Sequence, residues 1–568
     1  MMRARFVWGR MVSCRPIVNR PSCGGEQATR RPIGNRPQDS ILPHTSLRWV
    51  VSLCVVAAFA LAGASTAPDA KRWWSHILFL ADDKLEGRET GSEGHRQAAA
   101  YVAGEFERSG LKPAGTQGYL QPVKLHSRRI LEEQSSLALL RGGEREPLTL
   151  GEDAIFGMRV EPPQHLSAPM VFVGYGLVVP ELKYDDLAGL DLRGKVAVYM
   201  TGGPSSIPGP LRSHYQSSEE REKLWSRVGA VGTVSFTNPA ASDIPWSRTS
   251  AARLRPSMSL SGSDRVERLS ITVNPAHSDK FLAGSGHKFD ELIALSDAGK
   301  PLPVFPIPAS LEARATVENK DVESQNLAAI YPGSDPKLKR EFIALSAHLD
   351  HLGRGEPVNG DAIYNGAMDN ASGIATLLEI AATLHDSRAK LRRSILFVAV
   401  TAEEKGLLGS QYFATHSTVK ASDIVANLNA DMFLPLFPLR ILTAVGAEES
   451  DLGDRLRAVA APLGVKVQTD REPRRNLFIR SDQYNFIKRG IPALAFKVGS
   501  TPGSPEEAIS KKWLAERYHA PSDDVNQPVD LTAAADFNHL LLLLTEEIAN
   551  QTERPKWKEN SFFRRYAK

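Results

Sequence analysis

The chain has 568 residues, more than a single hydrophobic core usually organises, so at least two domains are expected. Hydrophobic residues make up 42% and charged residues 24%, which is ordinary for a globular enzyme and excludes a fibrous or low-complexity chain. The net charge of +4 is local, because residues 1–68 hold nine arginines and two acids while the remainder has 60 basic and 63 acidic residues. A body this close to neutral gives no electrostatic reason to expect a nucleic-acid partner.

The first 68 residues have the composition of a leader. Residues 1–47 are rich in Arg and Pro and show little apolar periodicity, which predicts disorder. An uncharged apolar run at 49–63 follows, and the small residues at 62–67 suit a signal peptidase. We therefore expect export to the periplasm or the extracellular space, with no membrane span after cleavage, or membrane retention if the signal stays uncleaved. The alternatives are a membrane anchor and a buried core helix.

All three cysteines of the chain, Cys14, Cys23 and Cys54, lie in this leader. The body therefore has none, which excludes disulfides and cysteine-bound zinc there. A metal site in the body must be built from His, Asp and Glu.

The body begins with helices and continues with strands. Two helices are expected within 71–110, and the second, 93–109, carries apolar residues at three-and-four spacing before Gly110. Residues 165–300 instead hold short apolar strands separated by Gly- and Pro-rich turns. This predicts a β-rich domain at 161–304, inserted into a larger discontinuous domain. The strands expected in the insertion lie at 170–175, 195–200 and 228–236, and the larger domain takes residues 69–160 and 305–555.

After residue 305 strands and helices alternate, which predicts an α/β fold with a mostly parallel central sheet and helices on both faces. In such sheets, functional sites collect at the carboxyl ends of the strands. The expected strands are 342–347, 394–401, 424–430, 439–445 and 492–498. The expected helices are 371–385, 407–415, 450–463, 482–488 and 531–550.

Acidic and histidine residues stand where these strands stop, or in loops that flank the helices. They are His348, Asp350, Asp369, Glu403, Glu404, Asp431 and His519. Strand ends of one parallel sheet meet at one edge, so these clusters can converge on a single point.

The residue types suit metal-assisted hydrolysis. His348 and Asp350 are two residues apart on extended chain, so Asp350 can hold one ring N–H of His348 while the other nitrogen binds metal. The adjacent Glu403 and Glu404 point to different sides, so one can bind metal while the other acts as a base. Asp369 could bridge two cations with its two oxygens, leaving each metal three protein ligands and an open position.

Each cluster alone has a simpler explanation, such as a surface hydrogen bond, a solvated helix start or an N-cap. Their order and placement at strand ends favour a dinuclear site. Three other histidines do not belong to these clusters of candidate ligands and are expected to be structural or at the surface: His351, His385 and His416.

The motifs resemble those of a known family, the co-catalytic zinc aminopeptidases that include bacterial leucyl aminopeptidases and yeast vacuolar aminopeptidase Y. Glutamate carboxypeptidase and the transferrin receptor are more distant relatives. The resemblance covers roughly residues 70–155 and 310–550, and residues 165–300 resemble, more weakly, an inserted protease-associated domain. The motifs are AHLDHLG (347–353), YNGAMDNASG (364–373), TAEEKGLLGS (401–410), NADM (429–432), RSDQYNF (480–486) and YHAPSD (518–523).

The resemblance implies two Zn²⁺ ions per chain. His348 and Asp431 would bind one zinc, Glu404 and His519 the other, and Asp369 would bridge them. Glu403 would be the general base for hydrolysis by a metal-bound hydroxide, with Asp350 behind His348. Members often have His where this chain has Gln483, which puts the pocket in question. Tyr484 is a candidate for lining that pocket or for hydrogen-bonding the developing oxyanion.

The expected activity is removal of N-terminal residues from peptide substrates. A carboxypeptidase or another amidohydrolase on the same scaffold remains open, because Arg474, Arg475 and Arg480 could line a pocket for a carboxylate. A single-zinc glutaminyl cyclase is less favoured, since residues for two metals are present. A non-catalytic binding homologue is opposed by the intact Glu403. The oligomeric state does not follow from the sequence.

Overall fold

The computed structural model describes residues 67–242, 244–263 and 266–567. The expected signal segment and nearly all of the leader lie outside these residues. Within the described ranges, no helix has both the length and the apolar character needed to cross a membrane.

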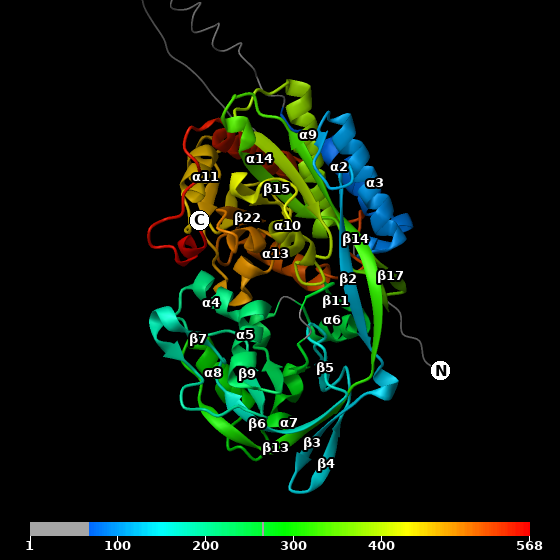
Figure 1. Cartoon of the computed structure of the whole chain (residues 1–568), viewed down its shortest axis with the longest axis vertical. Coiled ribbons are helices and arrows are strands. Elements are labelled where there is room, and N and C mark those ends of the chain that lie inside the picture. Colours follow the sequence, from blue (N-terminus) through cyan, green and yellow to red (C-terminus); the bar gives the residue numbers. More distant parts are fainter. Residues whose placement is uncertain (1–66, 243, 264–265, 568) are drawn as a thin grey trace, which may run out of the picture. The chain divides into compact units, whose positions relative to one another are not determined.

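The first sheet has ten strands with a parallel centre (Figure 1). Its central strands pair in parallel in the order β18 (Ser394–Val400), β15 (Phe342–His348), β19 (Ile424–Asn429) and β22 (Ala493–Val498). Every residue of β18 and β19 is buried, as expected for strands covered on both faces. The α/β class and all five strands predicted for this sheet are confirmed. The outer strands are β1 (Lys112–Pro113), β2 (Leu120–Ile130), β11 (Ser257–Leu260), β14 (Val317–Tyr331), β20 (Ile441–Val445) and β21 (Lys466–Gln468).

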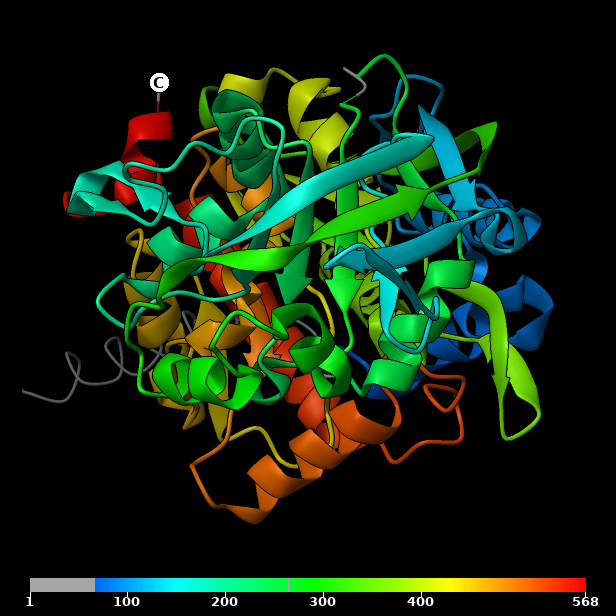
Figure 2. The same cartoon turned by 90° about the horizontal axis from the view of Figure 1, so that it is seen from below.

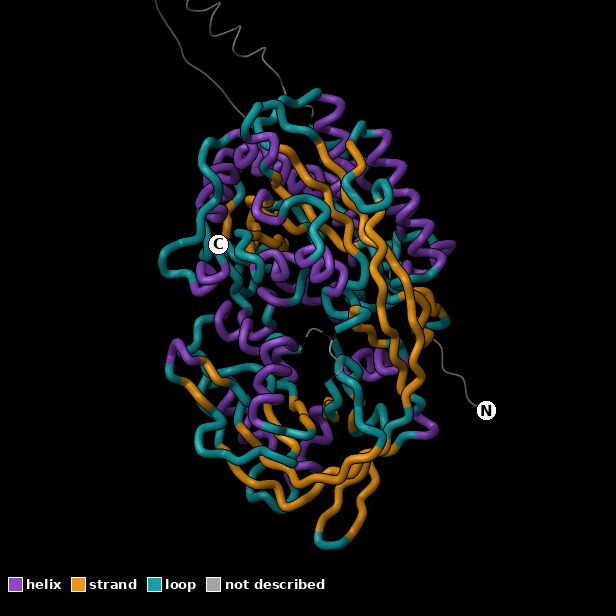
Figure 3. The backbone as a smooth tube through the Cα atoms, viewed as in Figure 1, coloured by secondary structure: helices purple, strands orange, loops and turns teal. Residues whose placement is uncertain are grey.

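Helices cover both faces of this sheet, because successive strand residues point to opposite sides (Figure 3). Ile395 and Phe397 of β18 join the larger core, which includes residues of α9 and α14. Leu396 and Val398 join a smaller core on the other face, with residues of α10 and α12. The helices of this part are α2 (Ala70–Leu80), α3 (Glu93–Arg108), α9 (Ser372–Ser387), α10 (Leu408–Thr415), α11 (Leu452–Ala460), α12 (Gln483–Ile487), α13 (Pro505–Glu516) and α14 (Leu531–Asn550).

A second sheet has eight strands, four of which run parallel (Figure 2). The parallel strands are β6 (His165–Val173), β9 (Val196–Met200), β10 (Gly232–Phe236) and β12 (Leu269–Val273). Antiparallel strands complete it: β3 (Ser136–Arg141), β4 (Glu144–Leu148), β5 (Ala154–Phe156) and β13 (Val304–Arg314). The associated helices are α4 (Gly209–Gln216), α5 (Ser218–Val228), α6 (Trp246–Ala251), α7 (Ser278–Leu282) and α8 (Phe289–Asp297). Two small hairpins pair β7 (Val178–Val179) with β8 (Tyr184–Asp185) and β16 (Gly353–Val358) with β17 (Asp361–Tyr364).

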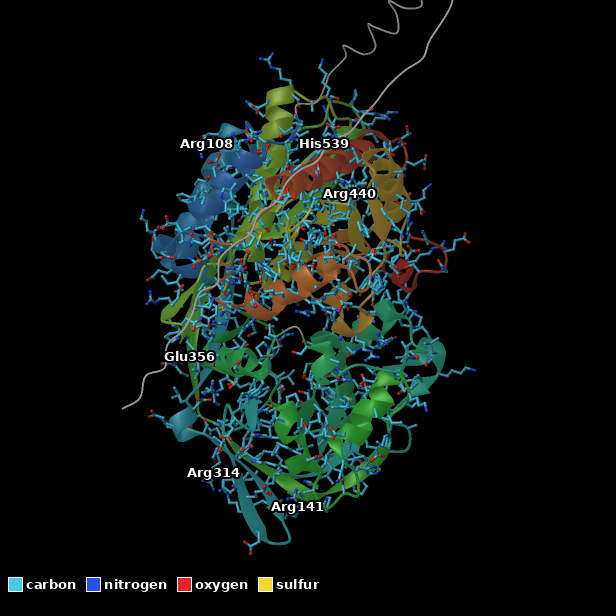
Figure 4. The ribbon with its side chains drawn as sticks, turned by 180° about the vertical axis from the view of Figure 1, so that it is seen from behind. Arg108, Arg141, Arg314, Glu356, Arg440 and His539 are labelled. Carbon is cyan, nitrogen blue, oxygen red and sulfur yellow. The ribbon has the colours of Figure 1, made fainter. Side chains whose placement is uncertain are left out.

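The second sheet extends beyond the predicted insertion, 161–304, at both ends. Strands β3, β4 and β5 precede residue 161 yet belong to the second sheet, and β13 extends to Arg314. The chain passes between the sheets through two successive antiparallel pairs, β2 with β14 in the first sheet and β3 with β13 in the second, separated by a short turn at Glu132–Gln134. Figure 4 labels Arg141 and Arg314, which end β3 and β13 in the second sheet.

Candidate metal centre

Three neighbouring strands deliver the site residues to one edge of the first sheet. His348 is the last residue of β15, Glu403 and Glu404 follow β18, and Asp431 comes two residues after β19. Because these strands are parallel neighbours, their carboxyl ends meet. The structure brings together all the metal-ligand candidates predicted from the sequence.

Asp369 lies between two histidines. Its Oδ1 is 3.2 Å from His348 Nε2, and its Oδ2 is 3.2 Å from His519 Nε2. The backbone N–H groups of Met368 and Asp369 donate to the carboxylate of Asp523 at 2.9 and 3.0 Å, which fixes this turn ahead of α9. Each oxygen of Asp369 thus faces a different ligand set, which is the orientation that a bridging carboxylate needs.

The ligand atoms form two groups that share Asp369. In the first, the ligand atoms of His348, Asp369 and Asp431 all lie within 4.8 Å of one another. In the second, His519 Nε2 is 3.3 Å from Glu404 Oε2 in addition to its contact with Asp369. This division into two groups matches the one that the family resemblance implies.

His351 belongs to the second group, and its assignment as a structural or surface residue was wrong. Its Nδ1 lies 2.8 Å from Glu404 Oε1 and 3.9 Å from Asp369 Oδ2, and the residue is fully buried. His351, Asp369 and Glu404 together meet the geometric criterion for a metal site. The signal was present in the spacing of His348 and His351, three residues apart just after a strand. His385 and His416 are exposed, as predicted.

Asp350 supports the site in a different way from the one predicted. His348 Nδ1 lies 3.0 Å from the main-chain oxygen of Asp350 and 4.0 Å from its carboxylate. The carboxylate instead accepts hydrogen bonds from the backbone N–H groups of Glu403 and Glu404 and from the Thr90 hydroxyl. The residue therefore fixes the His348 ring through its backbone and the glutamate pair through its side chain.

Arg88, which belongs to none of the predicted motifs, holds together the loops that carry the site residues. It is fully buried and donates to the carbonyl oxygens of Leu349, Asn365 and Gly366 at 2.6–3.0 Å. Burial lowers the pKa of its guanidinium to about 10, so it remains charged at neutral pH beside the acidic cluster. It connects the end of β15 to the turn that carries Asp369.

The two adjacent glutamates differ in environment. Glu403 lines the cavity at the site and its side chain is 12% exposed. Burial raises the pKa of Glu403 well above its ordinary value, and the nearby carboxylates of Glu404 and Asp431 add to this. For Glu404, burial acts in the same direction, but the charge of His519 and the close approach of the His351 and His519 rings bring its pKa below the ordinary value. Glu404 is thus the better ligand and Glu403 the better proton carrier.

The residues fit two zinc ions. Buried atoms without a hydrogen-bond partner gather at the site: Asp369 Oδ2, Glu404 Oε1 and both ring nitrogens of His351. Such atoms are costly unless an ion or another group satisfies them. The donors are imidazole and carboxylate, which zinc accepts in catalytic sites.

A cavity of about 450 Å³ opens onto the site. Its floor includes His348, Asp369, Glu403, Asp431 and His519, and its walls come from β20, β22, α13 and the segment 468–481. Ala240 and Ser242, from the region of the second sheet, complete the lining. The cavity is large enough for a short peptide end.

Tyr484, the candidate for lining the pocket or for hydrogen-bonding the oxyanion, does not line this cavity. It is 3% exposed, and its hydroxyl lies 2.7 Å from His214 Nδ1 at the junction with α4. Tyr484 instead packs in a core with Phe478 and Phe563. Gln483 is also buried and donates to the Phe478 carbonyl, so the departure at this position does not alter the cavity wall. The aromatic residue at the cavity is Tyr518.

Two of the three arginines considered for a carboxylate pocket line the cavity. Arg475 pairs with Glu472 at 2.6 Å, and Arg480 Nη2 lies 3.1 Å from the Tyr518 hydroxyl. Arg474 lies outside the cavity and pairs with Asp297 at 2.7 Å.

Comparisons with known proteins agree with this geometry. Residues 326–545 match the family model described as "Peptidase family M28". The chain is 26% identical to "probable leucine aminopeptidase 2" of Aspergillus oryzae, over 48% of this chain and 54% of that protein. It is 28% identical to "Aminopeptidase Y" of Saccharomyces cerevisiae, over 36% of this chain and 35% of that protein. Thus the chain spans about a third to a half of the length of these two relatives.

A third relative carries a different name, and one solved structure has the same fold. The chain is 23% identical to "Carboxypeptidase Q" of Homo sapiens, over 73% of this chain and 75% of that protein. The solved structure of an aminopeptidase from Aneurinibacillus sp. strain AM-1 superposes with a TM-score of 0.53 at 19% identity, covering 86% of this chain and 96% of that one. At this identity the superposition establishes the fold alone.

Proposed function

We propose that the chain, whose residues 326–545 match the model of peptidase family M28, is a member of that family and a dinuclear zinc exopeptidase that removes N-terminal residues from peptides. The observation that carries the proposal is the placement of Asp369, whose two oxygens face His348 and His519 at equal distances of 3.2 Å. A carboxylate so placed is suited to hold two ions in one site.

When bound, the two zinc ions supply acidification of water and polarisation of the scissile carbonyl. His348 and Asp431 would hold one ion, Glu404 and His519 the other, and Asp369 would contact both. His351 lies against Glu404 and either adds a donor to the second ion or orients that carboxylate.

Glu403 is assigned the proton transfers. It is the one glutamate of the pair that lines the cavity, and burial raises its pKa above the ordinary value, which favours proton uptake. It would take the proton of the attacking water and return it to the leaving amine. Asp350 holds the backbone of both glutamates, which keeps Glu403 aimed at the cavity.

The test measures hydrolysis and zinc content together. A panel of aminoacyl-nitroanilides should be cleaved by the zinc-loaded protein and not after chelation. Glu403→Gln should lower kcat by about a thousandfold, the middle of the range for a general base, while two zinc equivalents remain bound. Full activity of Glu403→Gln would refute the base assignment, and absence of cleavage by wild-type protein with two zinc ions would refute the aminopeptidase assignment.

A carboxypeptidase is the second candidate, supported by the long alignment with Carboxypeptidase Q and by the basic residues in the cavity. Peptides blocked at one end separate the two. An aminopeptidase cleaves C-terminally amidated peptides and spares N-acetylated ones, whereas a carboxypeptidase does the reverse.

We also propose that the protein is exported, on the basis of the basic, apolar and small segments in residues 1–67. N-terminal sequencing of the protein secreted by its native host should find a mature end between residues 62 and 69. Retention of residues 1–61 on the secreted or membrane-bound protein would contradict signal cleavage.

A further inference from the structure

Lys497 lies at the border between the metal centre and the cavity wall. It is on β22, next to β19, and lines the cavity with its side chain 26% exposed. Its Nζ is 2.6 Å from the main-chain oxygen of Asp431 and 3.7 Å from the Asp431 carboxylate. A lysine is an unusual neighbour for a residue that binds a divalent cation, because like charges repel.

The charges of the ligand carboxylates, of Glu403 and of two zinc ions cancel, so within this set none is left to offset Lys497. The ligand carboxylates Asp369, Glu404 and Asp431 carry three negative charges, Glu403 carries a fourth when ionised, and two zinc ions carry four positive charges. Lys497 is therefore an additional positive charge once the ions are bound. Among the described residues, its one carboxylate within ion-pair distance is Asp431.

The acids on the cavity wall do not neutralise Lys497 either. Glu472 pairs with Arg475 at 2.6 Å, and Glu507 pairs with Lys511 at 3.2 Å. Asp470 accepts a hydrogen bond from the Glu472 backbone N–H. The positive charge of Lys497 is therefore available to a ligand that binds in the cavity beside the metal centre.

We infer that Lys497 is a specificity residue that binds a substrate carboxylate close to the scissile bond. This inference rests on the proposed peptidase function. A substrate ammonium group is repelled from Lys497. A carboxylate at ion-pair distance from Lys497 is favoured in a cavity that partly excludes water.

The carboxylate has two chemical sources in a peptide. It is either the acidic side chain of the N-terminal residue or the free terminal carboxylate of a short peptide. In the second case the same lysine would serve a dipeptide-cleaving or carboxypeptidase activity. The residue chemistry at Lys497 is the same for both, so the experiment must separate them.

The experiment uses the full zinc-loaded protein and two matched substrate pairs. The first pair differs at the N-terminal side chain, Glu-Ala-Ala amide against Gln-Ala-Ala amide. The second differs at the C-terminus, Leu-Ala with a free carboxylate against Leu-Ala amide. In one pair, wild-type kcat/KM should favour the carboxylate-bearing member by about tenfold or more, as expected for a charge-assisted contact. The pair that shows the preference identifies the source.

Variants connect the preference to Lys497. Lys497→Met should reduce the ratio within that pair to near one, and Lys497→Glu should invert it. Lys512→Met is the matched control, because Lys512 is on α13 with its side chain 72% exposed and does not line the cavity. It removes the same charge and should leave the ratio unchanged.

Two further readouts keep the result decisive. Zinc content of every variant shows whether Lys497 merely supports Asp431, in which case zinc affinity falls and the substrate ratio stays constant. Calorimetric binding of the same peptides to zinc-loaded Glu403→Gln protein measures the preference without turnover. If the carboxylate-bearing peptides bind and react no better than their neutral partners, the inference is overturned. If binding shows the preference while no peptide is cleaved, the inference stands and the proposed peptidase function fails.

Discussion

Both sheets of this molecule contain four neighbouring parallel strands, but the residues that follow these strands differ. In each, four parallel strands bring their carboxyl ends to one edge, where ligands tend to bind. In the first sheet, the strand ends lead to His348, Glu403 and Asp431. In the second sheet, β9 leads to Thr201 and two glycines, and β10 leads to Thr237 and Asn238.

The difference appears in how buried polar atoms are satisfied. Asn238 donates to Asp297 and caps the turn at Ala240, so its side chain is fully used by the protein. At the metal centre, Glu404 and His351 keep buried atoms without hydrogen-bond partners. Parallel strands thus end at a hydrogen-bonded turn in the second sheet and at the candidate metal centre in the first. What distinguishes the two is the chemistry of the few residues that follow each strand.

The largest effect is expected from breaking the shared ligand. Asp369→Ala removes the carboxylate common to both groups, so the protein should lose at least one of two zinc equivalents and at least about a thousandfold in kcat/KM. Metal analysis after dialysis and nitroanilide assays measure both. Two retained zinc ions with near-normal activity would show that Asp369 does not bridge.

A second prediction concerns pH and the junction near the second sheet. Burial lowers the pKa of His214 to about 4, and its ring nitrogens contact the Tyr484 and Tyr566 hydroxyls. The unfolded chain binds this proton below about pH 6.5, so stability is complete above that pH and falls as the pH drops towards 4. The contribution lost is at most about 3 kcal/mol.

Urea unfolding of wild type and His214→Gln at pH 7 and pH 4.5 measures this contribution. The drop in unfolding free energy between the two pH values should be smaller in the variant, with His416→Gln, a surface change, behaving as wild type. Equal drops in wild type and His214→Gln would contradict the assignment.

A third prediction tests whether His351 contributes to zinc binding in the second ligand group. His351→Gln should weaken zinc binding about tenfold to a hundredfold, whether His351 binds the ion or orients Glu404. Competition with a chelator should resolve one weakened site and one normal site. His385→Gln, in an exposed histidine of α9, is the control. Unchanged affinity at both sites would return His351 to a purely structural role.

The smallest effect is expected at the junction near the second sheet. Tyr484→Phe removes one buried hydrogen bond to His214 and should cost about 1 kcal/mol of unfolding free energy. Activity should stay within about twofold of wild type, because the ring remains and lies outside the cavity. A large loss of kcat with normal stability would restore the role first considered for Tyr484.

Much of the fold and the metal ligands follows from the sequence. Mostly apolar runs predicted all the central strands, because a strand covered on both faces is buried along its length. The ligand candidates His348, Glu404 and Asp431 were predicted because each lies at the end of such a strand or within a few residues of it. Local pattern and residue chemistry were sufficient for this part.

The other features of the site and the fold were decided by tertiary structure. The place of His351 beside Glu404, and of Lys497 beside Asp431, depends on strands that are distant in sequence and adjacent in the sheet. Tyr484 looked like a pocket residue by its position in a motif, yet packing against Phe478 and Phe563 turned it into the core. The limits of the second sheet also depend on tertiary pairing, because the pair β2–β14 of the first sheet is followed closely by the pair β3–β13 of the second. Such features depend on contacts between segments far apart in the chain, which no local pattern records.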